Sequence, residues 1–450
     1  MLGGRLVLAL VTTTILSLSG LFALPGQTKA DAQPTTRVAQ TSEESAQPVS
    51  RGTDDIDDLA LNLNNPGSIV ERLEEDAEKK DYLFQFPGVT AALKPWYDFK
   101  ADMAGTYGLN FGISFSTLYQ KASDTFGPED DAAGFDFDVS GTWTFLGRET
   151  SSPTMLGFNF FRRNTLGTEL PPQTLFTQYG SLYSGAAPYG ENDPVIGEFW
   201  LQKKFDNAFG FRVGQIFPIT AYDFFPFKNF RTDFVDFNHV TNATIPLPGN
   251  GLGAFVVYRP QPNILLRLGA HDANADVEKS GFNTYDGELF TIFEVGFDTG
   301  LTPRVPGRPP GGHIHLSLWH QDDRKDAGID GGRGIGLSAV QRFGRFTPFV
   351  RYGYTDAEVS GPTSVKHMAN AGLVVDEIFG QMNDRIGVGV TWSDPIDRTL
   401  DDQTTVDAYY RVQVTPEIQM GPTLELIFDP ARNPDEDRIA IWGFRTRIAL

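Results

Sequence analysis

Two stretches near the C-terminus decide the fold: residues 407–414 read DAYYRVQV and residues 442–450 read WGFRTRIAL. Side chains of a β-strand point alternately to its two faces. In the first stretch Tyr410 and Val412 therefore share an apolar face, while Arg411 lies on a polar one. A soluble sheet with its apolar face inward has the same alternation. The number of alternating segments and the sequence that precedes them distinguish a soluble sheet from a membrane-spanning one.

The same two-residue period begins at Tyr107 and recurs to the end of the chain. The segments that carry it are 107–115, 135–145, 156–163, 198–205, 211–217, 252–258, 264–271, 290–297, 313–320, 334–342, 346–354, 367–374, 385–392, 404–414, 423–428 and 439–450. They make about 16 strands, each near the roughly 9–11 residues that a tilted strand needs to cross a bilayer.

The connections between these segments differ in length. Short ones alternate with long ones rich in Gly, Pro, Asp and Asn, at 164–196, 218–251, 273–288, 299–312 and 393–403. Short turns on one side and long loops on the other are typical of outer-membrane barrels. Charges on the polar faces would be costly in a soluble core but suit a wet lumen. The sequence therefore predicts an all-β fold, a transmembrane antiparallel β-barrel of 16 strands, with a soluble all-β protein as the alternative.

The N-terminal part precedes this pattern. Residues 1–32 have the features of a cleavable signal peptide: Arg5, an apolar run from Leu6 to Leu24, and an Ala-x-Ala site. Residues 33–93 are predicted as a flexible acidic tether, a helical or disordered periplasmic segment. Within it, the spacing of Ser68 and Glu71 predicts a capped, short helix. Residues 94–450 form the predicted outer-membrane barrel domain.

Composition excludes several classes. The formal net charge of -20 argues against a nucleic-acid partner, and an exported chain without Cys cannot rely on disulfides. His313 and His315 share a strand face, but the sequence places no third ligand beside them, so we predict no metal. No other cofactor is expected. Because no nucleophile, His and acid are brought together by a motif, an enzyme such as a barrel lipase is not predicted.

The C-terminal region resembles a known family. Residues 409–416 (YYRVQVTP) and 427–435 (IFDPARNPD), followed by the closing strand, resemble the carbohydrate-selective porins of the OprB type. Matches upstream are RVGQ at 212–215, GLGA at 251–254, YRP at 258–260 and GAHDAN at 269–274, so the resemblance runs from Lys94 to Leu450. Two features depart from it: Leu450 stands where an aromatic residue is usual, and the acidic tether is not part of the pattern.

The resemblance implies a 16-stranded barrel in the outer membrane of a Gram-negative-type bacterium. Its partners would be outer-membrane lipid and carbohydrates, either monosaccharides or small oligosaccharides, which diffuse passively into the periplasm. The oligomeric state is left open between a monomer and a homotrimer. The alternative function is a general or cation-biased porin for small solutes and ions without sugar selectivity.

Parity along the strands predicts which residues line the pore. They are Arg163, Glu198, Trp200, Arg212, Arg267, Glu294, Arg351, Arg385, Arg411 and Arg445. Arginine offers five donors in a fixed fork, so arginines facing carboxylates can hold sugar hydroxyls between them. Glu198 and Trp200 are predicted as the pair that contacts the sugar. The alternative is that these charges pair with one another and stiffen the wall. The aromatic stretch 222–227 (YDFFPF) is a candidate constriction loop.

Overall fold

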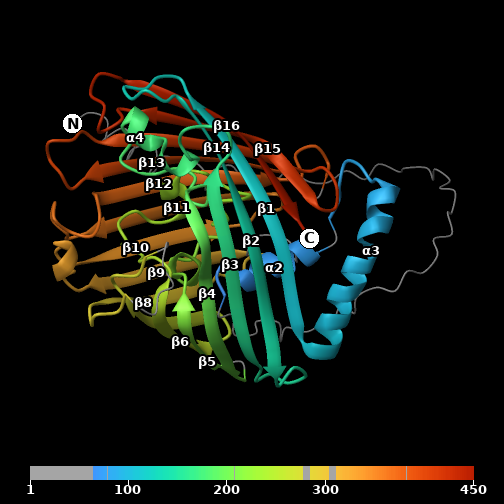
Figure 1. The fold of residues 1–450 in the computed structure, drawn as a ribbon. Helices are drawn as coiled ribbons and strands as arrows, with labels where there is room; N and C mark the ends of the chain where they lie inside the picture. The colour runs from blue at the N-terminus through green and yellow to red at the C-terminus, as the bar shows by residue number, and fades with distance from the viewer. Residues whose placement is uncertain (1–63, 79, 207, 277–283, 304–310, 382) are drawn as a thin grey trace, which may run out of the picture. The chain divides into compact units, whose positions relative to one another are not determined.

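The computed structural model describes residues 64–450 except 79, 207, 277–283, 304–310 and 382. Within them the chain forms one closed antiparallel barrel in which every strand pairs with its neighbours in sequence and β1 pairs with β16 (Figure 1). The predicted signal peptide and about half of the predicted tether, residues 33–63 and 79, lie outside the described residues.

All sixteen predicted strands are confirmed, in the predicted order. Their bounds are β1 Leu109–Ala122, β2 Asp131–Leu146, β3 Thr154–Thr165, β4 Asn192–Phe205, β5 Phe209–Ile216, β6 Gly251–Gln261, β7 Ile264–Asp272, β8 Leu289–Asp298, β9 Gly312–Gln321, β10 Gly332–Gln341, β11 Phe346–Thr355, β12 Val365–Asp376, β13 Arg385–Pro395, β14 Gln403–Gln413, β15 Ile418–Phe428 and β16 Arg438–Ala449. Several are longer than predicted, because small and polar residues extend the ladders beyond the clear alternation.

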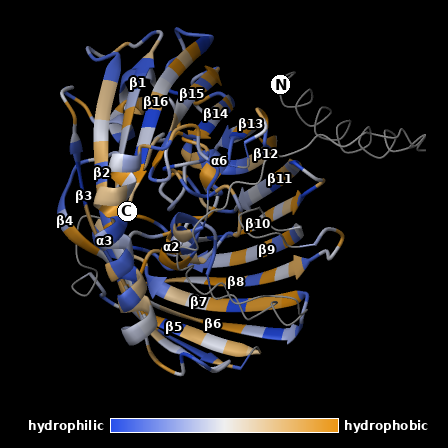
Figure 2. Cartoon of the chain, turned by 90° about the vertical axis from the view of Figure 1, so that its right-hand side faces the viewer, coloured by the Kyte–Doolittle hydropathy of each residue, from blue (hydrophilic) through white to orange (hydrophobic). Residues whose placement is uncertain are grey.

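The two faces of the wall alternate as the sequence predicts. On β16 the side chains of Trp442 and Phe444 are 52% and 47% exposed, whereas Arg445 and Arg447 are buried. The same alternation colours the strands in bands of hydrophobic and hydrophilic residues in Figure 2. The apolar residues face outward and the charged residues face the interior, which is the arrangement of a membrane barrel and the reverse of a soluble sheet.

The last residue closes the barrel. Leu450 N donates to Ile113 O at 2.9 Å, and Ile113 N donates to Leu450 O at 3.0 Å. From there the β1–β16 register runs from Ser114 opposite Ala449 to Ala122 opposite Ile441. Leu450 thus keeps the outward parity of the usual aromatic residue and pairs its backbone fully.

The connections define two ends of the barrel. We call the end that carries the C-terminus and the start of β1 the turn end, and the opposite one the loop end. Because the strands are antiparallel, the connection 299–311 between β8 and β9 lies at the turn end. Its predicted place among the long loops of the other end is therefore wrong. The other four long connections follow odd-numbered strands and lie at the loop end.

Within the described residues, two helices precede the barrel. They are α2 (Ile69–Ala77) and α3 (Pro87–Asp102), the latter continued by the π-helical turn η2 (Met103–Tyr107). The capped helix predicted at Ser68 is confirmed, since Ser68 Oγ accepts from Glu71 N. Its place differs from a periplasmic appendage: α2 lies inside the ring of strands (Figure 2). The chain leaves the lumen beside β14, where Leu83 N and Phe84 N donate to Gln413 O and Val414 O.

Helix α3 stays outside the lumen. Trp96 and Phe99 pack on Phe111, on the outward face of β1, with ring centroids 5.5 and 5.9 Å away. Tyr97 donates to Glu417 Oε1 at 3.2 Å. None of the helices in the described part of the chain is long and apolar enough to cross a membrane.

Two loop-end connections are largely buried. Residues 166–191 carry η3 (Pro172–Thr174) and α4 (Phe176–Tyr179), and residues 217–250 carry α5 (Pro218–Ala221) and α6 (Phe237–Val240). A further turn, η4 (Lys325–Ala327), lies between β9 and β10. We call residues 217–250 the inner loop, because its aromatic side chains Phe225, Phe227 and Phe234 are 0–1% exposed and pack on Phe349 of the wall.

The outward face predicts a strong asymmetry of substitutions on β9. Leu318, which is 44% exposed, should tolerate Phe but not Arg. A charge on the lipid face of a barrel costs about 2–4 kcal/mol near the bilayer midplane. Leu318→Arg should lower the free energy of unfolding in vesicles by about that amount, measured by urea titration with gel mobility as the readout. Equal stability of the Arg and Phe variants would contradict the assigned face.

Candidate functional site: the filled lumen

The predicted pore-lining residues all lie on inward positions of the wall. Each of them is more than nine-tenths buried except Arg163, whose side chain is 11% exposed. They are not open to a wide channel, because the inner loop and the segment 64–77 cover them.

Glu198, Trp200 and Arg212 form one cluster on β4 and β5. Trp200 Nε1 donates to Glu198 Oε2 at 3.0 Å, and the guanidinium of Arg212 lies 3.9 Å from the centre of the indole ring. The indole lies over Gly157 of β3, where a Cβ would approach it to 2.1 Å. The pair predicted from sequence is therefore together, but Trp200 is only 1% exposed and packs in a cluster with Ile69 of α2.

Arg267 and Glu294 face each other across β7 and β8. Arg267 Nη1 lies 3.2 Å from Glu294 Oε2 and also donates to Ala221 O of the inner loop. Glu294 Oε1 accepts from Asp223 N at 2.7 Å. This ion pair therefore holds the start of the inner loop to the wall.

Asp223 is the central anchor of the inner loop. It pairs with Arg351 of β11 at 2.6 Å and with Lys228 of the same loop at 3.5 Å. Burial opposes ionisation of Asp223, yet the Arg351 and Lys228 cations outweigh it and hold the pKa of Asp223 below its usual value. Burial also lowers the pKa of Lys228 to about 8, although Asp223 counteracts the shift. Arg351 donates in addition to His239 O and Thr241 O.

Three more predicted arginines bind the far part of the inner loop. Arg385 and Arg411 lie 3.3 and 3.6 Å from Asp233 Oδ1. Arg445 donates to Phe230 O and Asp233 O, both at 2.7 Å. The loop thus crosses the lumen from β7 to β16, and charged wall residues hold it at several points.

The last predicted arginine, Arg163, lies on β3. Arg163 pairs with Asp136 at 2.8 Å, and Arg231 of the inner loop reaches the other oxygen of that carboxylate at 2.6 Å. The predicted stretch 222–227 is confirmed as part of a loop inside the lumen. These contacts agree with the alternative given for the pore residues, that their charges pair with one another.

Sequence reasoning missed the second element in the lumen, the segment 64–77. It begins with a turn in which Ser68 N donates to Asn65 O at 3.1 Å and Gly67 takes a positive φ of 81°, which suits glycine. Asn64 and Asn65 accept from Arg212 and Arg267 at 2.6 and 3.1 Å. These wall arginines therefore hold the turn that leads into α2.

Helix α2 then pairs with three wall residues. Arg72 lies 3.3 Å from Asp138 of β2. Asp76 binds Arg447 of β16 through both oxygens, at 2.7 and 2.6 Å, and Glu75 lies 3.5 Å from Arg411. The alternation in β16 places Arg447 on the lumen side, but nothing in the sequence links it to Asp76, 371 positions away.

The two histidines of β9 lie side by side on the lumen face. His313 Nε2 is 3.3 Å from His315 Nδ1, and the outer nitrogens reach Asp298 at 2.7 Å and Glu294 at 3.1 Å. No cluster of three His, Cys, Asp or Glu able to hold a metal occurs within the described residues. The arrangement is a hydrogen-bonded row in the wall.

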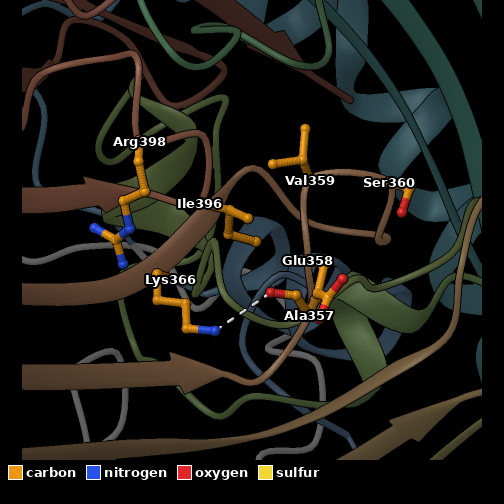
Figure 3. Close-up of a pocket in the computed structure, with 7 residues that line it drawn as sticks. All are labelled: Ala357, Glu358, Val359, Ser360, Lys366, Ile396 and Arg398. Atoms are coloured by element: carbon orange, nitrogen blue, oxygen red, sulfur yellow. Dashed lines mark hydrogen bonds between the residues drawn. The ribbon is translucent and has the colours of Figure 1, made fainter.

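A separate hollow of about 550 Å³ lies at the loop end. The connections after β11 and β13 and the start of β12 line it, and Lys366 Nζ donates to Ala357 O at 3.4 Å across its edge (Figure 3). None of the ten predicted pore residues lines this hollow. It is therefore distinct from the filled lumen.

Removal of the Asp223 carboxylate should loosen the inner loop. Asp223→Ala leaves Arg351 and Lys228 buried without their anion, and breaking one side of a buried pair costs about 3–5 kcal/mol. Hydrogen exchange of amides at 221–242 should therefore accelerate by roughly 10²–10³-fold. Asp356→Ala removes a carboxylate from the exposed pair with Arg333 and serves as the control. Unchanged exchange in the Asp223 variant would remove the residue as an anchor.

Acid should release α2 from the lumen. Burial raises the pKa of Asp76, but Arg447 outweighs it, with Lys80 and Arg72 assisting, so the pKa lies below the usual 3.8. For such a carboxylate the stabilising contribution is complete above its usual pKa and is lost as pH falls through the lowered value. Channel conductance, corrected for bulk conductivity, should rise as pH falls from about 5 to 2. In the Asp76→Asn variant this rise should be largely absent.

Comparisons with known proteins agree with this architecture. Residues 321–450 match the family model described as carbohydrate-selective porin, OprB family. The upstream motifs at 212–274 lie outside that match. No curated protein matches the sequence.

One solved structure shares the fold at low sequence identity. The high pH structure of Pseudomonas putida OprB aligns with a TM-score of 0.63 and 14% identity, over 79% of this chain and 97% of that chain. The low pH structure of the same protein gives a TM-score of 0.47 at 13% identity, with the same shares of both chains. A mutant of Rh. blastica porin gives 0.46 at 11% identity, over 76% of this chain and 100% of that chain.

The predicted resemblance is confirmed: the chain has the porin fold, and its last third carries the sequence pattern of the carbohydrate-selective porin, OprB family.

Proposed function

We propose that the protein is a passive diffusion channel for small carbohydrates in the outer membrane of a Gram-negative-type bacterium. One observation carries the proposal: a closed barrel with an apolar exterior and a charged, hydrogen-bonding interior, whose C-terminal part matches the carbohydrate-selective family. In hydrocarbon, only helices and closed barrels satisfy every backbone polar group. The outward apolar face supports a membrane location for this one.

The chemistry of the interior suits neutral polyols. Sugar hydroxyls both donate and accept, so a path for them needs arginines and carboxylates side by side. The wall provides such neighbours in the Arg267–Glu294 and Arg163–Asp136 pairs. Because lumen arginines are matched by carboxylates, the net charge of -20 gives little support to a cation-biased channel, the alternative function.

We propose that Glu198 and Trp200 contact the sugar only when the segment 64–77 has moved. Trp200 is 1% exposed, so a sugar can reach it only after the segment 64–77 moves away. In this structure the predicted arginines hold the inner loop and the segment with α2 to the wall through hydrogen bonds and ion pairs. Solute would pass through the space between these contacts, or after the contacts of the inner loop or of the segment 64–77 break.

Liposome swelling tests the proposal. Vesicles that contain the folded, full-length protein should swell in isotonic solutions of a pentose or a hexose, more slowly in a disaccharide and least in a trisaccharide. Protein heated until its compact gel band disappears serves as the control. Absence of sugar-dependent swelling with the folded protein would contradict a sugar channel.

Reversal potentials in planar bilayers separate the two candidate functions. Under a tenfold salt gradient a sugar channel should show weak ion selectivity and a current that a hexose reduces. A strongly cation-selective current unaffected by any sugar would favour the general ion porin.

A further inference from the structure

The carboxylates of α2 occupy an arginine-rich site on the lumen wall. Arg411 of β14 and Arg447 of β16 lie beside a crevice of about 10 Å³ that Arg231 and Arg445 also line. Asp76 makes a two-pronged contact with Arg447 at 2.6–2.7 Å, and Glu75 lies 3.5 Å from Arg411. Two-pronged pairing of this kind is the strong, planar mode in which arginine recognises a carboxylate.

The two acidic residues are placed unfavourably for the dipole of the helix that carries them. Glu75 and Asp76 lie in the last turn of α2, where the carbonyl ends of the helix dipole disfavour negative charge, and no basic residue of that turn compensates. A nine-residue helix is also marginal in water on its own. The contacts with Arg411 and Arg447, together with the 3.6 Å pair of Asp76 with Lys80, therefore explain the position of the two carboxylates better than the helix dipole does.

The contact is also poised to exchange. The side chain of Glu75 is 36% exposed and that of Asp76 17%, whereas Arg411 and Arg447 are 9% and 4% exposed. The arginines are built into the wall, while the carboxylates reach them from a short segment. A bound segment of the same chain acts as a tethered ligand with an effective concentration in the millimolar range. A free carboxylate at similar concentration can compete with it.

We propose that Arg411 and Arg447 form an anion site that the chain fills with Glu75 and Asp76, and that sugar acids, which carry one carboxylate on a polyol, displace α2 from it. This inference rests on the proposed channel function and names a solute class for it. Neutral sugars lack the group that the arginines bind, and leaving buried arginines without an anion is costly. A neutral sugar therefore cannot displace Glu75 and Asp76 from the two arginines.

The test measures single-channel current with the full-length protein and three variants. In Glu75→Gln with Asp76→Asn, Arg447 loses its carboxylate partner and Arg411 keeps only Asp233, at 3.6 Å. The expected results are a conductance at least twofold higher, a reversal potential shifted toward anions, and block by glucuronate at a concentration at least tenfold lower than in the unaltered chain. Adding Arg447→Gln should abolish the gain in glucuronate block. Block by glucose should stay unchanged in both.

Asp98→Asn is the matched control. It makes the same acid-to-amide change in the exposed Lys94–Asp98 pair of α3, whose side chains are 69% and 63% exposed, and it should leave conductance and block unaltered. Heat-modifiable gel mobility verifies folding, and Asp76→Asn alone replaces the double variant if that fails to fold.

The outcomes separate the two proposals. If current flows and glucose blocks it, but glucuronate blocks the amide variant no better than the unaltered chain, the anion site is refuted and the channel stands. If none of the folded proteins passes current, the channel function fails and the anion site fails with it.

Discussion

The structure depends on the closure of one backbone ladder. In a bilayer no water satisfies a free N–H or C=O group, so the sheet must return to its first strand. The hydrogen bonds between Ile113 and Leu450 begin that closure, and β1 and β16 continue it to Ala122. Closure also separates two environments, since each residue along a strand faces either the lipid side or the interior.

That separation leaves an interior full of charge, which the chain must neutralise. A buried ion is expensive without a partner, and several arginines of the wall meet partners that lie outside it. The inner loop provides Asp223, Asp233 and several backbone carbonyls. The segment with α2 provides Glu75 and Asp76. The interior is thus held together by polar contacts that also narrow the path.

Parity predicted much of the site but few of its contacts, among them that of Glu198 with Trp200. It placed Arg351, Arg385 and Arg445 on the inward face, because alternation along a strand is a local property. Several arginines meet an anion from a loop or helix far away in sequence, as Arg351 meets Asp223. The same limit explains Trp200: alternation directs its ring inward, but the ring is covered by Arg212 and by a cluster that includes Ile69 of α2.

By itself the sequence determined the number and order of the strands, the lipid-facing residues, the Ser68 helix cap and the resemblance of the C-terminal part, since all of these depend on patterns within a few residues. Only the tertiary structure decided that α2 lies inside the barrel and that the inner loop crosses it. Those features follow from ion pairs such as Asp76–Arg447, which join positions 371 residues apart. Local patterns carry no information on such pairs.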